Sequence, residues 1–388
     1  MSAQRLHDYL TERCLYTDRT YQLCHHFCTA VRAVFPSYKN GIDSLVGGLY
    51  VLSSLLMGVF YLARKTNRMR IYRILGLIKN YDYLKEIEEN VNPHKPVVVW
   101  ENLVLLIQSH TMAIIGIYLF IFVAKWQSFL WAVTIYVCGF YSLSGGSHML
   151  YSHRSYKASK LYELVIMCFH STLMQNSIIH WARDHRCHHK FGDTDADPTN
   201  RGRGAFFAHT GWLIYEKHPE VIRQGRKLDI SDLTNNPILA FQRKYLGLCY
   251  AVFHAVIPVS VAVFGWEERF WTAWITCVTV PWVMSLNCVG LVNSYFHSGG
   301  YKPYNRNITP TDGPWWRHVF TLGSGDHNFH HTFPQDYAES EFNSPFLFTK
   351  HIIDFCSLFG LTYDRKTASQ EMVERRRLRN GERFQLDY

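Results

Sequence analysis

The sequence is poor in paired cysteines. Its ten cysteines stand singly, only Cys24 and Cys28 lie as close as four residues apart, and no C-x-x-C motif occurs. In a chain of 388 residues this spacing excludes a secreted disulfide scaffold and a structural zinc site of the finger or ribbon kind. Residues 1–39 carry charges throughout and contain no apolar run, so we expect no cleavable signal peptide.

Charged residues are also scarce. Only 18% of the residues are Asp, Glu, Lys or Arg, whereas 48% are hydrophobic, and this balance excludes an intrinsically disordered chain. Basic residues outnumber acidic residues by 40 to 31, which gives a formal net charge of +9. The length is sufficient for one large domain or two ordinary ones.

What the sequence has instead is long uncharged runs. A membrane-spanning helix needs roughly 20 apolar residues, and five stretches qualify: 45–63, 102–124, 129–147, 246–264 and 270–292. The last four form two pairs, each joined by a very short loop, and short loops join antiparallel helices. We therefore predict an all-α integral membrane protein with four transmembrane helices in two hairpins, and a possible fifth span at 45–63.

The distribution of basic residues predicts the orientation. A basic cluster separates the first run from the first hairpin: Arg64, Lys65, Arg68, Arg70 and Arg73. By the positive-inside rule this side faces the cytosol. Residues 148–245 and 293–363 then form a helical cytosolic cap, in which Leu161 to Trp181 is expected to be a helix lying against the hairpins. We expect residues 1–100 to be an N-terminal extension, 101–363 the main domain and 364–388 a basic tail.

Histidine is abundant, with 21 residues. Eight of them fall into three motifs at the cap side of the predicted membrane: His148 and His153 in HMLYSH, His185, His188 and His189 in HRCHH, and His327, His330 and His331 in HNFHH. The i, i+3, i+4 spacing places imidazoles on one helical face, where they can converge on a metal. Neutral imidazole is the commonest metal ligand, so these motifs predict at least one metal ion and favour two.

A ninth candidate lies at the end of the last predicted span. Asn293 and His297 are four residues apart, level with the other motifs. His297 can complete the ligand set, and Asn293 can orient a metal-bound water. Because the motifs hold no carboxylate and exceed the needs of one four-coordinate zinc, we expect two iron ions with open positions for oxygen.

At this point the sequence resembles a known family, the membrane fatty acyl-CoA desaturases of the stearoyl-CoA desaturase type. The resemblance runs from about Asn92 to Tyr363 and is carried by WARDHRCHHKFGDTDADP, GWLIYEKHP, NSYFH and GDHNFHH with the following FPQDY. It implies four membrane helices in two hairpins, capped by a cytosolic domain with a di-iron centre held by the nine histidines, with Asn293 holding a water.

The resemblance also implies the reaction and its partners. It implies that a saturated fatty acyl-CoA and O2 are the substrates and that a cis double bond forms, with Delta(9) as the expected position. Electrons would come from cytochrome b5 and its NADH-dependent reductase. No HPGG haem motif is present, so the cytochrome would be a separate protein. The implied location is the endoplasmic reticulum membrane with the active site facing the cytosol, and no nucleic-acid partner is expected.

By the same resemblance, five residues would contact the coenzyme A or the acyl thioester: Asn102, Asn176, Arg183, Asp184 and Lys217. The chain departs from the family pattern at several positions: Met149, Tyr151, His180, Glu216, Gly290 and Phe140. Glu216 stands where a basic residue is usual, which keeps the acyl carrier open. Gly290 and Phe140 fall on the expected acyl tunnel, Phe140 near its closed end, and Tyr136 is the candidate tunnel floor.

Two other interpretations are compatible with the sequence. A di-iron hydroxylase, or a desaturase acting on a lipid-linked or sphingoid chain, shares the histidine motifs. A membrane metal transporter belongs to another class, but it would place its ligands at the midplane of broken helices. The histidines here stand at the ends of the apolar runs or beyond them.

Overall fold

The computed structural model describes residues 47–48 and 96–382. The chain divides into two compact units, Met1–Leu52 and Ser53–Tyr388. Gly47 and Gly48, the described residues of the first unit, are helical. The possible span at 45–63 otherwise lies outside the described residues, as does the basic cluster that follows it.

Four helical stretches of the second unit are long and apolar enough to cross a membrane: Trp100–Phe122, Trp126–Ser152, Leu246–Trp266 and Phe270–Ser294. The prediction of four spans in an all-helical membrane protein is therefore confirmed. The first stretch is α5 (Trp100–Phe122), and the second joins α6 (Trp126–Tyr141) to the π-helix η2 (Ser142–Ser152). The second hairpin is built from α13 (Leu246–Cys249), η5 (Tyr250–Val256), α14 (Ile257–Trp266), α15 (Phe270–Trp274), η6 (Ile275–Thr279) and α16 (Val280–Ser294).

Two prolines explain the π-helical segments η5 and η6 within the second hairpin. Pro258 follows η5 and Pro281 follows η6, each within the first two residues of the next α-helix. A proline has no N–H to donate and clashes with the carbonyl four residues earlier. The turn before it therefore widens into a π-helical segment, which membrane helices tolerate when neighbours satisfy the freed groups.

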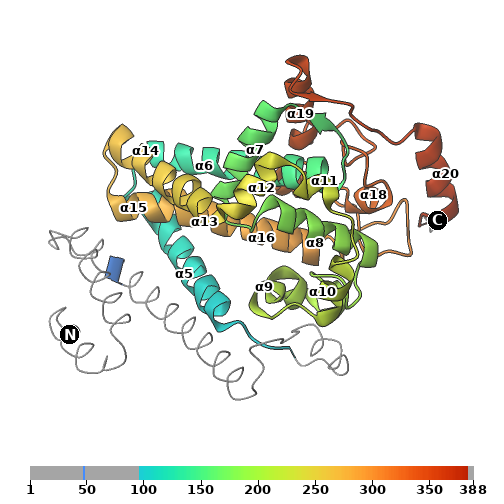
Figure 1. Cartoon of the computed structure of the whole chain (residues 1–388), viewed down its shortest axis with the longest axis horizontal. Helices are drawn as coiled ribbons and strands as arrows, with labels where there is room; N and C mark the ends of the chain where they lie inside the picture. The colour runs from blue at the N-terminus through green and yellow to red at the C-terminus, as the bar shows by residue number, and fades with distance from the viewer. Residues whose placement is uncertain (1–46, 49–95, 383–388) are drawn as a thin grey trace, which may run out of the picture. The chain divides into compact units, whose positions relative to one another are not determined.

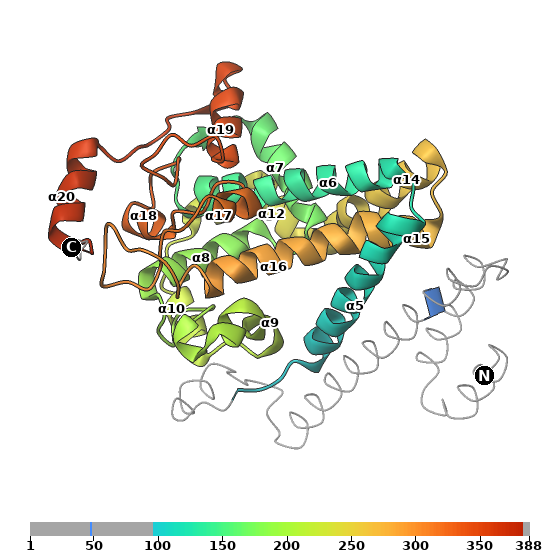
Figure 2. The same ribbon diagram turned by 180° about the vertical axis from the view of Figure 1, so that it is seen from behind.

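The short loops of the two hairpins lie together at one end of the bundle. Glu268, only 5% exposed, accepts hydrogen bonds from the Lys125 N–H at 2.9 Å and the Ser128 hydroxyl at 2.6 Å. The Trp266 indole in turn donates to the Ser128 hydroxyl at 2.8 Å. Figures 1 and 2 show the turn between α14 and α15 at this end, with the cap helices α8, α10 and α18 at the other.

The cap is made of short helices. They are α7 (Lys160–Thr172), α8 (Ile178–Phe191), η3 (Arg201–Arg203), η4 (Phe207–Gly211), α9 (Trp212–Ile214), α10 (Pro219–Gly225), α11 (Ser231–Thr234), α12 (Pro237–Lys244), α17 (Trp316–Thr321), α18 (His327–Thr332) and α19 (Phe348–Leu358). The basic tail contains one further helix, α20 (Gln370–Asn380). Two-residue strands β1 (Lys157–Ala158) and β2 (Thr362–Tyr363) pair antiparallel, with Lys157 opposite Tyr363.

The helix expected from Leu161 to Trp181 is in fact two helices. α7 ends at Thr172, and α8 begins at Ile178 behind Ser177, whose hydroxyl accepts a hydrogen bond from the His180 N–H at 3.3 Å. Met174 and Asn176 between them have φ of 53° and 66°, a left-handed backbone that interrupts a helix. This break turns α8 and its histidines toward the end of the membrane helices.

Candidate metal centre

The first histidine motif lies on η2, at the end of the second span. His148 and His153 are five residues apart, a spacing that separates side chains on an α-helix but places them one turn apart on a π-helix, where the bond runs from i to i+5. The His153 N–H donates to the His148 carbonyl at 3.1 Å, and the ring centroids are 4.9 Å apart. The π geometry therefore directs both imidazoles to the same side.

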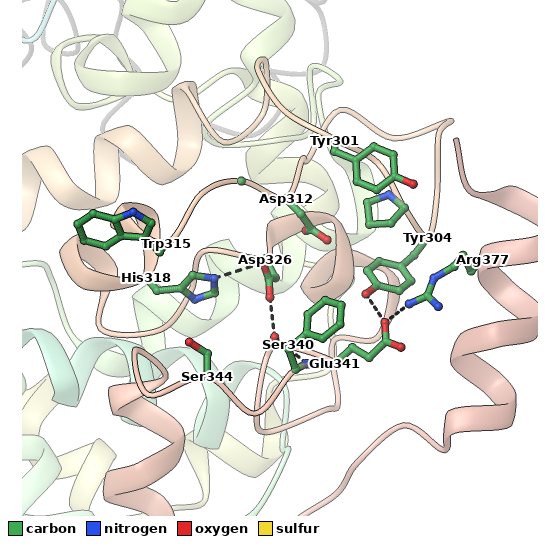
Figure 3. A pocket seen from close by; sticks show the side chains of 13 residues that line it. Tyr301, Tyr304, Asp312, Trp315, His318, Asp326, Ser340, Glu341, Ser344 and Arg377 are labelled. Atoms are coloured by element: carbon green, nitrogen blue, oxygen red, sulfur yellow. Dashed lines mark hydrogen bonds and ion pairs between the residues drawn. The ribbon is translucent and has the colours of Figure 1, made fainter. Parts of the chain in front are cut away.

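The other motifs lie on α8, on α18 and just beyond α16. His185, His188 and His189 share one side of α8, and His297 follows α16 by three residues. α18 begins where Asp312 accepts the N–H groups of Asn328 at 2.7 Å and Phe329 at 3.1 Å. Asp312 also lines a cavity of about 620 Å³, together with Asp326, which contacts His318 and Ser340 (Figure 3).

The structure divides the nine histidines into two groups, and the ligand nitrogens within each lie no more than 4.8 Å apart. One group holds His148, His153, His185, His189 and His330, and the other holds His188, His297, His327 and His331. The motifs on α8 and α18 each contribute to both groups. From α8, His185 and His189 belong to one group and His188 to the other, and from α18, His330 belongs to the first and His327 and His331 to the second. His189 and His331, one from each group, stack with ring centroids 4.0 Å apart.

The arrangement of nitrogens fits a bound cation. Within the five-histidine group, the Nε2 atom of His330 lies 2.9 Å from that of His148 and 3.1 Å from that of His189. Within the other, Nε2 of His327 lies 3.2 Å from those of His297 and His331. A neutral imidazole has one N–H, so such a cluster cannot pair all of its nitrogens internally, whereas a metal ion accepts a lone pair from each.

Burial favours the neutral form of most of these imidazoles. Burial, reinforced by the neighbouring histidines, lowers the pKa of six of them well below the usual value: His153, His185, His189, His327, His330 and His331. Burial also lowers the pKa of His297, with Asp193 opposing it. For His188 burial acts in the same direction, but the Asp197 carboxylate outweighs it and raises the pKa. A neutral imidazole is the form that binds a metal.

Carboxylates stand behind two ligands of the four-histidine group. Nδ1 of His188 lies 3.0 Å from both oxygens of Asp197, and Nδ1 of His297 lies 3.6 Å from Asp193. A carboxylate at Nδ1 holds the proton there and leaves Nε2 for the metal. Sequence reasoning did not assign these aspartates a role, although both belong to the acidic string GDTDADP directly after the second motif.

The centre opens onto a cavity of about 200 Å³ between α5, α8, α9 and α16. Its walls include His185 and His188, one from each histidine group, and also Asn293. Three of the expected substrate contacts also line it, namely Asn102, Asn176 and Asp184. Apolar side chains from α5 and α16 form part of the walls: Leu105, Leu106, Trp282, Leu286 and Val289.

Arg183 and Lys217 lie next to this cavity and are paired with Asp184. The Arg183 guanidinium donates to Asp184 at 2.7 and 3.0 Å, and the Lys217 ammonium pairs with the same carboxylate. Burial acts to raise the pKa of Asp184, but His180, Lys217 and Arg183 together lower it. The three charged residues predicted to contact the substrate therefore form one cluster. This cluster also includes His180, one of the positions that depart from the family pattern, whose Nε2 lies 3.0 Å from Nζ of Lys217.

The predicted tunnel residues lie outside the walls of this cavity. Phe140 is 3% exposed and stacks on Tyr136, with ring centroids 5.7 Å apart, and the Tyr136 hydroxyl contacts Cys288 Sγ at 3.1 Å. A β-carbon at Gly290 would lie 2.8 Å from the His209 carbonyl oxygen, so the glycine lets η4 pack closely on α16. The tunnel role of these residues stays a prediction.

Four helices long and apolar enough to cross a membrane, with two groups of mostly buried imidazoles at one end that could hold metal ions, define a multi-pass membrane protein with a candidate polyhistidine metal site. Residues 124–338 match the family model described as fatty acid desaturase. The chain therefore belongs to the fatty acid desaturase family and is an oxidoreductase. The family resemblance inferred from the motifs is confirmed.

Individual relatives agree with this assignment. The chain is 43% identical over 293 residues to the Delta(9)-fatty-acid desaturase fat-6 of Caenorhabditis elegans, covering 74% of this chain and 85% of that protein. It is 40% identical over 299 residues to an acyl-CoA Delta(11) desaturase of Choristoneura rosaceana, covering 77% and 89%. It is 40% identical over 294 residues to stearoyl-CoA desaturase 5 of Bos taurus, covering 74% and 86%.

Proposed function

We propose that the protein is an acyl-CoA desaturase that inserts a cis double bond at Delta(9) into a saturated fatty acyl-CoA. The observation that carries the proposal is the cavity in which apolar walls from two membrane helices meet the imidazoles of the metal centre. An alkyl chain fits such walls, and a polar cluster at Asp184 suits the thioester end. The names of the relatives that act on acyl-CoA support this substrate class.

The nine histidines would hold two iron ions, five around one and four around the other, with Asn293 beside the second through a water. Bound iron would supply the oxidant, made from O2, that removes hydrogen from an unactivated methylene, which no side chain can do. Each double bond formed removes two hydrogens, and the reduction of O2 to two waters then consumes two further electrons and two protons. A cytochrome b5 reduced by its NADH-dependent reductase would deliver these electrons.

The chain's own residues would bind and orient the substrate. Arg183 and Lys217 can pair with the coenzyme A phosphates, while Asn102, Asn176 and Asp184 contact the polar end of the acyl group. The apolar walls exclude water and fix which methylene faces the imidazoles. We further propose the endoplasmic reticulum membrane as the location, with the cap facing the cytosol, where acyl-CoA and the cytochrome are present.

A product assay tests the proposal. The chain would be expressed in yeast that lacks its own Delta(9) desaturase and fed saturated acids of 14 to 18 carbons. A cis monoene with its bond at carbon 9, located by mass spectrometry, is the expected product. A bond at carbon 11 would place the enzyme with its Delta(11) relatives, and hydroxylated product would favour the hydroxylase alternative.

A further inference from the structure

Glu339 is a buried carboxylate that lies against two metal-centre histidines. Its side chain is 3% exposed, with Oε1 3.5 Å from Nδ1 of His148 and Oε2 3.8 Å from Nδ1 of His330. These histidines come from motifs 182 residues apart in the sequence, and both belong to the five-histidine group. One carboxylate thus faces the outer nitrogens of two members of the same group.

Two of these atoms are otherwise unpartnered. Among the residues that the structure describes, Oε2 of Glu339 and Nδ1 of His330 are buried and make no hydrogen bond. A buried polar atom normally has a partner. Since the two atoms face each other at 3.8 Å, a small rotation of either side chain brings them to hydrogen-bonding distance.

The backbone around Glu339 is built to aim this side chain. Glu339 has φ of 54°, a left-handed conformation that is costly for a residue with a β-carbon. Asp336 holds the turn in place: its carbonyl accepts the Glu339 N–H at 3.2 Å, and its carboxylate accepts the N–H groups of Ala338 and Ala368 at 2.9 and 2.8 Å. A strained residue that its surroundings hold so firmly is typical of functional sites.

We infer that Glu339 is a positioning residue for the five-histidine group, an inference that rests on the proposed function. It holds the proton of both His148 and His330 on Nδ1, so that both Nε2 lone pairs face one metal ion. The four-histidine group uses a different arrangement, in which Asp197 serves His188 and Asp193 serves His297. Each metal ion therefore depends on its own carboxylates.

The Glu339→Gln variant tests this assignment because it keeps the size of the side chain. A glutamine has one carbonyl oxygen and one NH2 group, so it can accept from only one of the two imidazoles. Its NH2 group favours the tautomer of the other imidazole in which Nδ1 carries the lone pair and Nε2 the proton. That histidine can then no longer offer Nε2 to the metal.

The measurement is titration of the purified, metal-free full chain with Co²⁺, followed by its visible absorption bands and by metal counting. Wild-type protein should bind two equivalents. Glu339→Gln should weaken one of them by about 10- to 100-fold, the usual effect of removing a partner behind a metal ligand. Asp197→Asn should weaken the other, so the double variant should weaken both.

Glu341→Gln is the matched control. Glu341 lies two residues further on and pairs with Tyr304 and Arg377 instead of a histidine (Figure 3). This variant should bind both equivalents like the wild type. If Glu339→Gln does not fold, Glu339→Asp replaces it, because a carboxylate one methylene shorter cannot reach both imidazoles.

The inference is overturned if wild-type protein binds two equivalents and Glu339→Gln, melting like the wild type without metal, binds both with unchanged affinity. It is also overturned if Glu339→Gln and Asp197→Asn weaken the same equivalent. Wild-type protein that binds fewer than two equivalents contradicts the proposed function itself.

Discussion

At the scale of single residues, the position of one proton decides whether an imidazole can bind a metal. Asp197 faces Nδ1 of His188 at 3.0 Å, and Thr309 and Asp193 face Nδ1 of His297 at 3.2 and 3.6 Å. These contacts leave Nε2 free for the metal. Because these two ligands are held from behind, replacing either imidazole removes a preformed ligand position.

His188→Ala should abolish desaturation while leaving membrane insertion intact. His188 is one of four ligands in its group, and losing a ligand should cost more than the roughly 100-fold that losing an outer partner costs. Product formation in the yeast assay and the amount of protein in the membrane fraction measure the two effects. The control is His351→Ala, because His351 contacts the Ser344 carbonyl and no ligand group. Substantial product from His188→Ala would remove this residue from the ligand set.

Phe140→Ala should lengthen the preferred acyl chain by a few carbons. Phe140 is buried two turns before His148 on the second span, at the predicted closed end of the tunnel. Removing the ring opens space for additional methylenes. The chain-length profile of products from acids of 14 to 18 carbons measures the shift. Phe129→Ala, which truncates a phenylalanine exposed at 52% on the same helix, should leave the profile unchanged. An unaltered profile in Phe140→Ala would contradict the tunnel assignment.

At the scale of elements, the site depends on how tightly the helices pack. η2 carries the first histidine motif and contacts α7 through Gly146, where an added β-carbon would lie 2.3 Å from Cγ2 of Ile166. Both Gly146 and Ile166 are buried. Space for one extra carbon is therefore lacking at this crossing, and a larger residue must displace the Ile166 side chain or one of the two helices.

Gly146→Ala should lower stability by about 1–3 kcal/mol, the usual cost of overpacking. The melting temperature of the purified protein, read from tryptophan fluorescence, measures the change. Gly247→Ala on α13 is the comparison, because nothing lies within 4 Å of its added carbon. In that open helical position alanine should be neutral or stabilising by up to about 1 kcal/mol. Equal melting temperatures for Gly146→Ala and wild type would show that the crossing is looser than described.

At the scale of the whole molecule, both hairpin loops lie at the end opposite the metal centre. Glu268 ties them together through Lys125 and Ser128, whereas the imidazoles lie where the second and fourth spans end. With an even number of described spans, residues 96–99 before α5 and the segment after α16 lie on the same side as the cap, and Val98 pairs with Tyr215 there. Whether that side faces the cytosol or the lumen depends on the distribution of Lys and Arg in the loops.

A glycosylation acceptor in a long flexible insert reports this orientation. Inserted after Glu267, between α14 and α15, it should be glycosylated, because this loop is expected to face the lumen. The same insert between Leu228 and Asp229, in an exposed part of the cap, should stay unmodified. A shift on gels that disappears with glycosidase measures the modification. The reverse pattern would place the metal centre in the lumen.

The sequence by itself determined the four spans, the histidine motifs and the family, because hydropathy and motif spacing are properties of a local stretch of chain. Only the tertiary structure decided how the nine imidazoles divide. His188 joins His297, His327 and His331 although it neighbours His189, since membership depends on which helices converge.

The roles of Asp193, Asp197 and Glu339 likewise appeared only in three dimensions, because nothing in the sequence links an acidic residue outside the histidine motifs to a particular imidazole. The π-helical turn that aligns His148 with His153 lies in η2, which packs against α7 and α8. Local sequence therefore determines which residues are available for the chemistry. Packing between distant segments determines which of them meet, because that depends on contacts no local pattern encodes.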